Sequence, residues 1–145
     1  MSQLQGPYLD EQVFLLLSQN FSLCKKIVDR ELRTTGVTLA EYSLLRILQN
    51  TPSITASSAR KRLFTSAPSI AQLVKSIERK DLIQRGSDRR DVRRQPMTLT
   101  KKGEALVTDA RRIIQRSLRR LTIPEKLLQA LQSNLFSLFS SLSSL

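Results

Sequence analysis

Residues 66–100 read SAPSIAQLVKSIERKDLIQRGSDRRDVRRQPMTLT, and this stretch decides the fold. Its first half predicts a helix over residues 67–80, because apolar side chains recur there at three- and four-residue steps. Ser66 is the expected N-cap, and Pro68 is acceptable in the first turn, where a missing N–H has no helical partner. The side chains expected to be buried are Ile70, Leu73, Val74 and Ile77.

Two short strands are expected after this helix, over residues 82–85 and 97–100. Pro96 suits the start of a strand, because it cannot donate an N–H to the ladder. Between the strands lies a charged loop with two aspartates, Asp88 and Asp91, among five arginines. This loop is either a solvated charge run or a probe for something negatively charged. Its arginines are Arg85, Arg89, Arg90, Arg93 and Arg94.

The rest of the chain is predicted to be helical. A first helix over residues 8–33 ends before Gly36. Thr38 and Glu41 form a capping-box pattern that begins a second helix near Leu39. With only four glycines and five prolines in 145 residues, the composition argues against an all-β fold. The predicted fold class is mainly α with a small β-wing. The further helices are expected from Thr55 to Leu63, from Thr100 to Arg120, and from a second capping-box pattern at Thr122–Glu125 to the C-terminus.

The net charge of +12 is unevenly distributed along the chain. Residues 1–54 carry five Lys/Arg and five Asp/Glu, whereas residues 55–104 carry thirteen against five. Residues 105–145 carry six against two. Generic solubility does not require such clustering. A basic surplus concentrated in one third of the chain indicates a polyanionic partner, with nucleic acid as the leading class.

A short helix, a tight turn, a second helix and two strands around a charged loop form the pattern of a winged helix-turn-helix. In such modules the second helix lies in the major groove of double-stranded DNA, which admits one α-helix. Polar side chains on its outward face can reach base edges, and cations can reach phosphates. A plain solvent-facing surface is the alternative, and the adjacent basic loop favours contact. The candidate DNA-binding residues of this helix are Ser66, Ser69, Gln72, Lys75, Ser76 and Arg79.

The segment over residues 38–103 resembles the MarR family of bacterial winged-helix transcription regulators. Three stretches carry the resemblance, and the wing signature in the last of them is the most specific. They are LAEY at residues 39–42, IAQLVKSIE at residues 70–78, and DRRDVR at residues 88–93 followed by Leu99-Thr100 and Gly103.

The resemblance implies a single domain over residues 1–145 that forms a homodimer. Residues 38–103 are expected to form the winged helix-turn-helix. Residues 1–37 and 104–145 are expected to supply the helices that dimerise. Two such modules would read a pseudo-palindromic duplex. Small aromatic or phenolic effectors bound between the two layers are a further property that the resemblance implies.

The resemblance also assigns roles within the DNA-binding module. It places a recognition helix over residues 67–80 in the major groove and a wing over residues 85–96 in the minor groove. Arg93 is the residue expected to enter the minor groove, where a narrow groove concentrates negative potential. Asp88 and Asp91 are expected to pair with arginines and order the wing. The other candidate wing contacts are Arg89, Arg90 and Arg94.

The chain departs from the family pattern at several positions. Many members carry glycine where this chain has Phe64 and Asp81. Many carry arginine where it has Gln72 and Val92, and small polar residues often occupy the position of Pro68. The fold assignment tolerates these changes, but the base preference of relatives does not carry over.

The last helix carries leucines at alternating three- and four-residue steps, the pattern of a packed helical seam. A subunit interface with the first helix of a partner chain is favoured over packing within the same chain. A membrane-surface helix is a third reading, and the scarcity of cations on the polar face argues against it. The candidate dimerisation residues are Val13, Leu17, Phe21, Leu128, Leu131, Leu135, Leu138 and Leu142.

Cys24 is the only cysteine, so an internal disulfide is excluded. Its place on the apolar stripe of the first helix favours a buried structural thiol over a redox sensor. The sequence contains no histidine, no Gly-rich phosphate loop and no nucleophile elbow, so neither an enzyme nor a cofactor or metal site is predicted. No signal peptide or bilayer-spanning run is apparent, which makes the cytoplasm the expected location.

The sequence therefore predicts a DNA-binding transcription regulator, with repression as its expected effect. The alternative is a dimeric interaction or architectural protein that binds nucleic acid without sequence preference, or that sequesters a partner regulator. Selection of a defined duplex from a random DNA pool would discriminate between these two classes.

Overall fold

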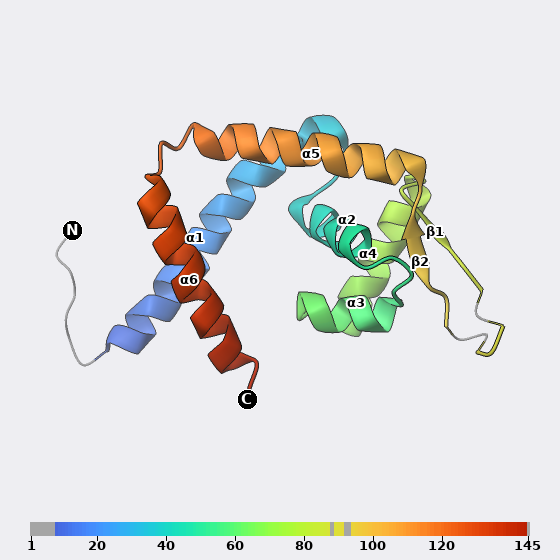
Figure 1. Ribbon diagram of the computed structural model, residues 1–145, viewed down its shortest axis with the longest axis horizontal. Helices are drawn as coiled ribbons and strands as arrows, with labels where there is room; N and C mark the ends of the chain where they lie inside the picture. Colours follow the sequence, from blue (N-terminus) through green and yellow to red (C-terminus); the bar gives the residue numbers. More distant parts are fainter. Residues whose placement is uncertain (1–7, 88, 92–93, 145) are drawn as a thin grey trace.

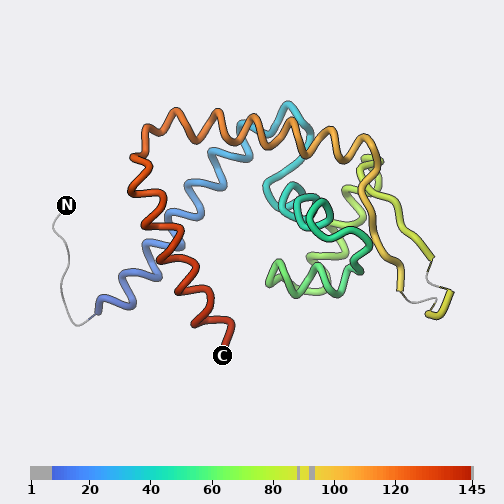
Figure 2. The backbone as a smooth tube through the Cα atoms, viewed as in Figure 1, coloured from blue at the N-terminus to red at the C-terminus, as the bar shows by residue number. Residues whose placement is uncertain are grey.

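The computed structural model describes residues 8–87, 89–91 and 94–144. Figures 1 and 2 show α5 running along one side of the molecule, with α1 and α6 at one end and the helix-turn-helix and wing at the other. The predicted fold class, mainly α with a small β-wing, is confirmed. The elements are α1 (Leu9–Leu32), the 3-10 turn η1 (Arg33–Thr35), α2 (Leu39–Asn50), α3 (Ala56–Leu63), α4 (Ala67–Arg79), β1 (Ile83–Arg85), β2 (Met97–Leu99), α5 (Lys101–Arg119) and α6 (Glu125–Leu142).

Side-chain caps set the starts of four helices, as the sequence predicts. Thr38 and Glu41 form both bonds of the capping box that begins α2. The hydroxyls of Thr55, Ser66 and Thr100 each accept a hydrogen bond from the backbone N–H three residues later, which begins α3, α4 and α5. The module therefore has its helix boundaries fixed by local sequence.

One glycine is required where α5 meets the wing. A Cβ atom added to Gly103 would lie 2.1 Å from the carbonyl oxygen of Leu82, so no other residue fits without a backbone shift. The same carbonyl accepts a hydrogen bond from the N–H of Thr100 at 3.1 Å. Thr100 and Gly103 of the Leu-Thr-x-x-Gly pattern thus pack the start of α5 against the backbone of Leu82, which leads into β1.

The main core lies inside the helix-turn-helix, between α2, α4, the two strands and α5. The predicted buried face of α4 is confirmed at Ile70, Val74 and Ile77, and Leu73 is half-buried. A smaller cluster of Val28, Leu32 and Ala110 joins the C-terminal half of α1 to α5. The main core consists of Val37, Leu44, Leu45, Leu48, Ile54, Ala59, Ile70, Val74, Ile77, Leu82, Ile83, Met97 and Val107.

The predicted start of α6 is wrong. Its N-cap is Pro124, which offers no side-chain acceptor, and α6 begins at Glu125. Thr122 has a φ of +50°, in the left-handed region. Glu125 is therefore the first residue of the helix rather than its third, so the capping-box geometry expected for Thr122 does not form.

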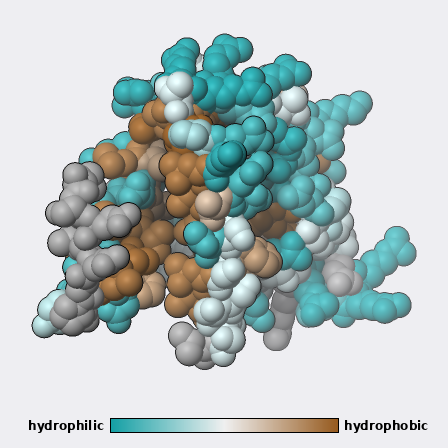
Figure 3. Space-filling model, turned by 60° about the vertical axis from the view of Figure 1, so that its left-hand side comes forward, coloured by the Kyte–Doolittle hydropathy of each residue, from teal (hydrophilic) through white to brown (hydrophobic). Residues whose placement is uncertain are grey.

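The apolar faces of α6 and of the N-terminal part of α1 are largely uncovered, which corrects the expected burial of Cys24. In the described residues α6 contains no buried position, so its own chain does not bury the leucine stripe. Cys24 is exposed, because it lies ahead of Val28 and Leu32, the buried positions of α1. Figure 3 shows apolar side chains gathered on the end of the molecule that α1 and α6 form. No helix in the described part of the chain is long and apolar enough to cross a membrane.

Candidate nucleic-acid interface

The outward face of α4 presents short polar and basic side chains to solvent. Ser69, Gln72, Lys75 and Arg79 are all exposed, and Ile70, Val74 and Ile77 fix this orientation by occupying the core on the opposite side. The hydroxyl of Ser66 donates to that of Ser69 at 2.8 Å at the start of the helix. This is the arrangement that a helix needs to reach base edges and phosphates.

The expected outward position of Ser76 is wrong, because its side chain faces α2. The hydroxyl of Ser76 donates to Oε1 of Glu41 at 2.5 Å. Lys80 Nζ donates to Oε1 and Oε2 of the same carboxylate at 2.8 and 2.9 Å, and to the carbonyl oxygen of Gly36 at 2.8 Å. The N–H of Thr38 donates to Oε2 at 2.9 Å. Glu41 therefore ties the C-terminal half of α4 to the start of α2.

Glu41 is 4% exposed, so its charge is held away from water. Burial alone would raise the pKa of this carboxyl, but hydrogen bonds from Lys80, Ser76 and Thr38 outweigh burial and hold the pKa below its ordinary value. The carboxylate is thus ionised at neutral pH and fully hydrogen-bonded. The sequence pattern identified Glu41 only as a capping residue, and the ion pair with Lys80 depends on a tertiary contact that periodicity does not reveal.

The wing is a two-stranded antiparallel ribbon. Ile83 pairs with Leu99 and Arg85 with Met97, and the N–H of Gly86 extends the pairing by donating to the carbonyl oxygen of Pro96 at 2.7 Å. Both strands are one residue shorter than predicted, because Leu82 precedes β1 and Thr100 serves as the N-cap of α5.

Arg85 has a structural role in the wing that the sequence did not indicate. Its Nη2 lies 3.1 Å from Oε2 of Glu78 in α4, and its Nη1 donates to Oε1 of Gln95 at 3.0 Å. Arg85 thereby connects both arms of the wing to α4. A run of five arginines gives no signal that separates this residue from the four nearer the tip.

The tip of the wing carries the remaining arginines. Arg89, Arg90 and Arg94 are exposed, and the N–H of Arg94 donates to the carbonyl oxygen of Asp91 at 2.9 Å. Asp88 and Arg93 lie outside the described residues. The described part of the tip thus presents three exposed cations.

A groove of about 390 Å³ lies between the start of α3 and the base of the wing. It is lined by serines and Lys61 of α3 and by Arg85 and Arg94 of the wing. Hydroxyl, guanidinium and ammonium groups are the usual partners of phosphate oxygens. This wing-base groove therefore carries the chemical groups that a phosphate-binding surface needs. No group of three or more metal-ligating side chains occurs among the described residues.

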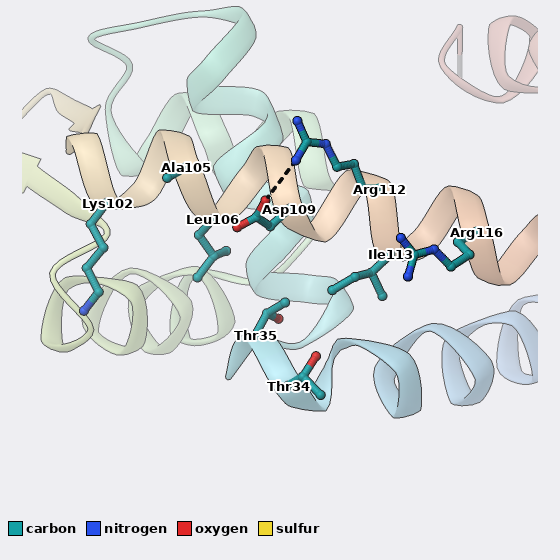
Figure 4. A pocket seen from close by; sticks show the side chains of 9 residues that line it. All are labelled: Thr34, Thr35, Lys102, Ala105, Leu106, Asp109, Arg112, Ile113 and Arg116. Carbon is teal, nitrogen blue, oxygen red and sulfur yellow. Dashed lines mark ion pairs between the residues drawn. The ribbon is translucent and has the colours of Figure 1, made fainter.

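A second groove, of about 580 Å³, lies between η1 and α5 (Figure 4). Leu106 and Ile113 point from α5 toward Thr34 and Thr35, and Lys102 and Arg116 lie at opposite ends. Arg112 at its edge forms an ion pair with Asp109 at 3.6 Å. This α5 groove, lined by Thr34, Thr35, Lys102, Ala105, Leu106, Asp109, Arg112, Ile113 and Arg116, combines an apolar floor with cationic ends.

Comparison with known proteins shows which family the central module is similar to. The sequence profile of the MarR family matches residues 35–94, which include α2, α3, α4 and most of the wing. The chain is 24% identical over 132 residues to the transcriptional regulator SarZ of Staphylococcus aureus, covering 90% of this chain and 88% of SarZ. Residues 35–94 of this chain are therefore similar to the MarR family.

Solved structures extend the MarR likeness over the whole fold. A MarR-family transcriptional regulator from Rhodococcus sp. RHA1 superposes with a TM-score of 0.82 at 21% identity, covering 92% of this chain and 96% of that one. Staphylococcus aureus MepR in complex with DNA superposes with a TM-score of 0.73 at 26% identity, covering 90% of this chain and 96% of MepR. The flanking helices, which the MarR profile does not match, therefore also follow the arrangement of these solved structures.

Proposed function

We propose that this chain is a DNA-binding transcription regulator that binds a pseudo-palindromic duplex as a homodimer and represses transcription from it. The observation that carries the proposal is the exposed polar face of α4 beside a basic wing, on a module whose core fixes both. The structure of MepR with DNA supports it at the level of the family.

Base readout is assigned to the major groove. Gln72 can bond bidentately to adenine, Ser69 can bond several base edges, and Lys75 can reach guanine or phosphate. Arg79 and Ser66, at the two ends of α4, are assigned to the phosphate backbone. Ser76 is left out of this set, because Glu41 occupies its hydroxyl.

The wing is assigned to the minor groove. Arg93 is proposed to enter the groove, flanked by Arg89, Arg90 and Arg94, because negative potential is concentrated where the minor groove is narrow. The wing-base groove places Lys61 and Arg94 for the adjacent phosphates. Most of the binding energy would then come from phosphate contacts and counterion release, so affinity should fall steeply with salt.

Dimerisation is assigned to α1 and α6, the flanking parts of a single domain whose centre is the winged helix-turn-helix of residues 38–103. The proposed interface residues of α6 form one stripe that is exposed or half-buried in the single chain. A continuous row of exposed leucines along one helix indicates an interface. A two-fold dimer built on it would place two recognition helices for two half-sites.

An effector site is proposed in the α5 groove. Its apolar floor of Leu106 and Ile113 fits an aromatic ring, and the cationic ends, Lys102 and Arg116, fit a carboxylate or phenolate. Because η1 and α5 connect the dimerisation helices to the DNA-binding module, a ligand wedged between them would alter the angle between the two layers.

Replacing Arg93 by alanine is expected to weaken binding of the selected duplex by roughly 1–3 kcal/mol, the range for a specific nucleic-acid contact. The measurement is a mobility-shift titration at one fixed salt concentration. Arg119→Ala is the matched control, because Arg119 is an exposed arginine at the far end of α5 and its removal changes the net charge equally. Equal affinities for the two variants would remove Arg93 from the mechanism.

A further inference from the structure

Phe64 occupies an unfavourable backbone position in the turn between α3 and α4. Its φ is +50°, in the left-handed region that a bulky side chain rarely adopts. Glycine or asparagine would end α3 at this position at lower cost. A bulky aromatic residue that is kept in such a conformation points to a role for its side chain.

The ring of Phe64 meets the ring of Phe139 in α6. Their centroids are 5.6 Å apart and their planes are inclined at 83°, the edge-to-face arrangement that aromatic pairs prefer. Both rings are otherwise open to solvent, Phe64 being 71% and Phe139 51% exposed. Figure 1 shows the C-terminal part of α6 descending beside the end of α3 that leads into α4. The contact therefore joins the helix-turn-helix to a helix that has no buried residue of its own in the described range.

This contact gives the DNA-binding module a second attachment. The first lies at the opposite side, where Leu39 and Tyr42 of α2 pack against the cluster of Val28, Leu32 and Ala110. Phe64 stands two residues before Ser66, the N-cap of α4, so a restraint on its ring is a restraint on the start of α4. With two attachments, the module is less free to rotate against α1 and α6 than with one.

We propose that the Phe64–Phe139 contact sets the spacing between half-sites that the protein accepts. In a two-fold dimer, the angle between each module and the dimerisation helices determines the separation of the two recognition helices. By holding that angle, the contact penalises duplexes whose half-sites are too close or too far apart. Phe64 and Phe139 are thus positioning residues that act on spacing and touch no base. The inference rests on the proposed function and concerns how its site is placed.

The spacing test compares Phe139→Ala with Phe136→Ala as a matched control. Phe136 is an equally large, exposed ring on α6 with no aromatic neighbour among the described residues. Each protein is titrated with the duplex that the wild type selects and with duplexes carrying one base pair more or fewer between the half-sites. In Phe139→Ala the preference for the selected spacing is expected to fall about two- to tenfold, the equivalent of one aromatic pair. Phe136→Ala is expected to keep it. An equal preference in wild type and Phe139→Ala overturns the proposal.

The contact itself is tested without DNA. The chain contains no tryptophan, so Phe139→Trp creates a single fluorescent reporter at the contact. Adding Phe64→Ala is expected to move the emission of this tryptophan to longer wavelength, because a neighbouring ring is replaced by water. Unchanged emission overturns the proposal. If the wild type selects no duplex, both the proposed function and the role in spacing are disproved. The tryptophan emission does not depend on DNA, so it shows separately whether the Phe64–Phe139 contact exists.

Discussion

Replacing Lys80 by methionine is expected to lower the free energy of unfolding by about 3 kcal/mol, the cost of leaving a buried ion unpaired. The loss arises at Glu41, which stays buried while its only cationic partner among the described residues is removed. The hydroxyl of Ser76 and the N–H of Thr38 still bond to the carboxylate, so the loss stays at the lower end of the range for buried pairs. Urea denaturation followed by circular dichroism measures it.

Lys75→Met is the control, because Lys75 is an exposed lysine on the same helix and its replacement should change stability by no more than about 0.5 kcal/mol. The effect also depends on pH. The folded-state pKa of Glu41 lies below the ordinary value of 4.5, so its stabilisation is present above that pH and is lost as pH falls through the folded pKa. The difference between wild type and Lys80→Met should therefore narrow in acid. Equal losses for Lys80→Met and Lys75→Met at neutral pH would show that the ion pair is not structural.

Replacing Leu135 by glutamate is expected to raise the dissociation constant of the dimer about 100-fold or more. The stripe of α6 is proposed to be buried against the partner, and two-fold symmetry introduces the substitution twice into one interface. Each carboxylate would have to leave water without a cation to pair with it, and this desolvation opposes association. A cost of about 1.4 kcal/mol corresponds to a tenfold loss of affinity, so that cost incurred twice corresponds to about 100-fold. Analytical ultracentrifugation over a concentration series measures the constant, and duplex binding should weaken with it.

Ser133→Glu provides the matched control for dimerisation. Ser133 is exposed two residues before Leu135, on the opposite side of α6, so it adds the same charge to the same helix away from the proposed interface. Its dissociation constant should stay within about threefold of wild type, as expected for a surface substitution. If both variants dimerise as well as the wild type, α6 does not form the subunit interface.

Local sequence was sufficient for most of the fold. Caps at Thr38, Thr55, Ser66 and Thr100 are reliable because each needs only a hydroxyl and a backbone N–H three residues later. The capping-box pattern at Thr122 fails because the chain there takes a left-handed turn before Pro124, which the pattern alone does not reveal.

The candidate site was predicted less completely, because several of its residues act through tertiary contacts. Ser76 lies on the polar side of α4 by periodicity, yet a buried carboxylate on α2 turns its hydroxyl inward. Arg85 is indistinguishable in sequence from the tip arginines, and only the fold brings it to Glu78. The exposure of Cys24 follows from an apolar stripe that one chain alone does not cover.

Selection of duplex DNA from a random pool by the protein tests whether it recognises a defined sequence. We expect enrichment of one pseudo-palindromic sequence, with half-site centres about 10 base pairs, one helical turn, or a multiple of it apart. The enriched positions should include bases in the major groove, where Gln72 and Lys75 are assigned, and an adjacent minor-groove position for Arg93. The opposite result is salt-dependent binding of the random DNA with no sequence enriched after selection. That result would contradict sequence-specific recognition and identify a protein that binds nucleic acid without sequence preference.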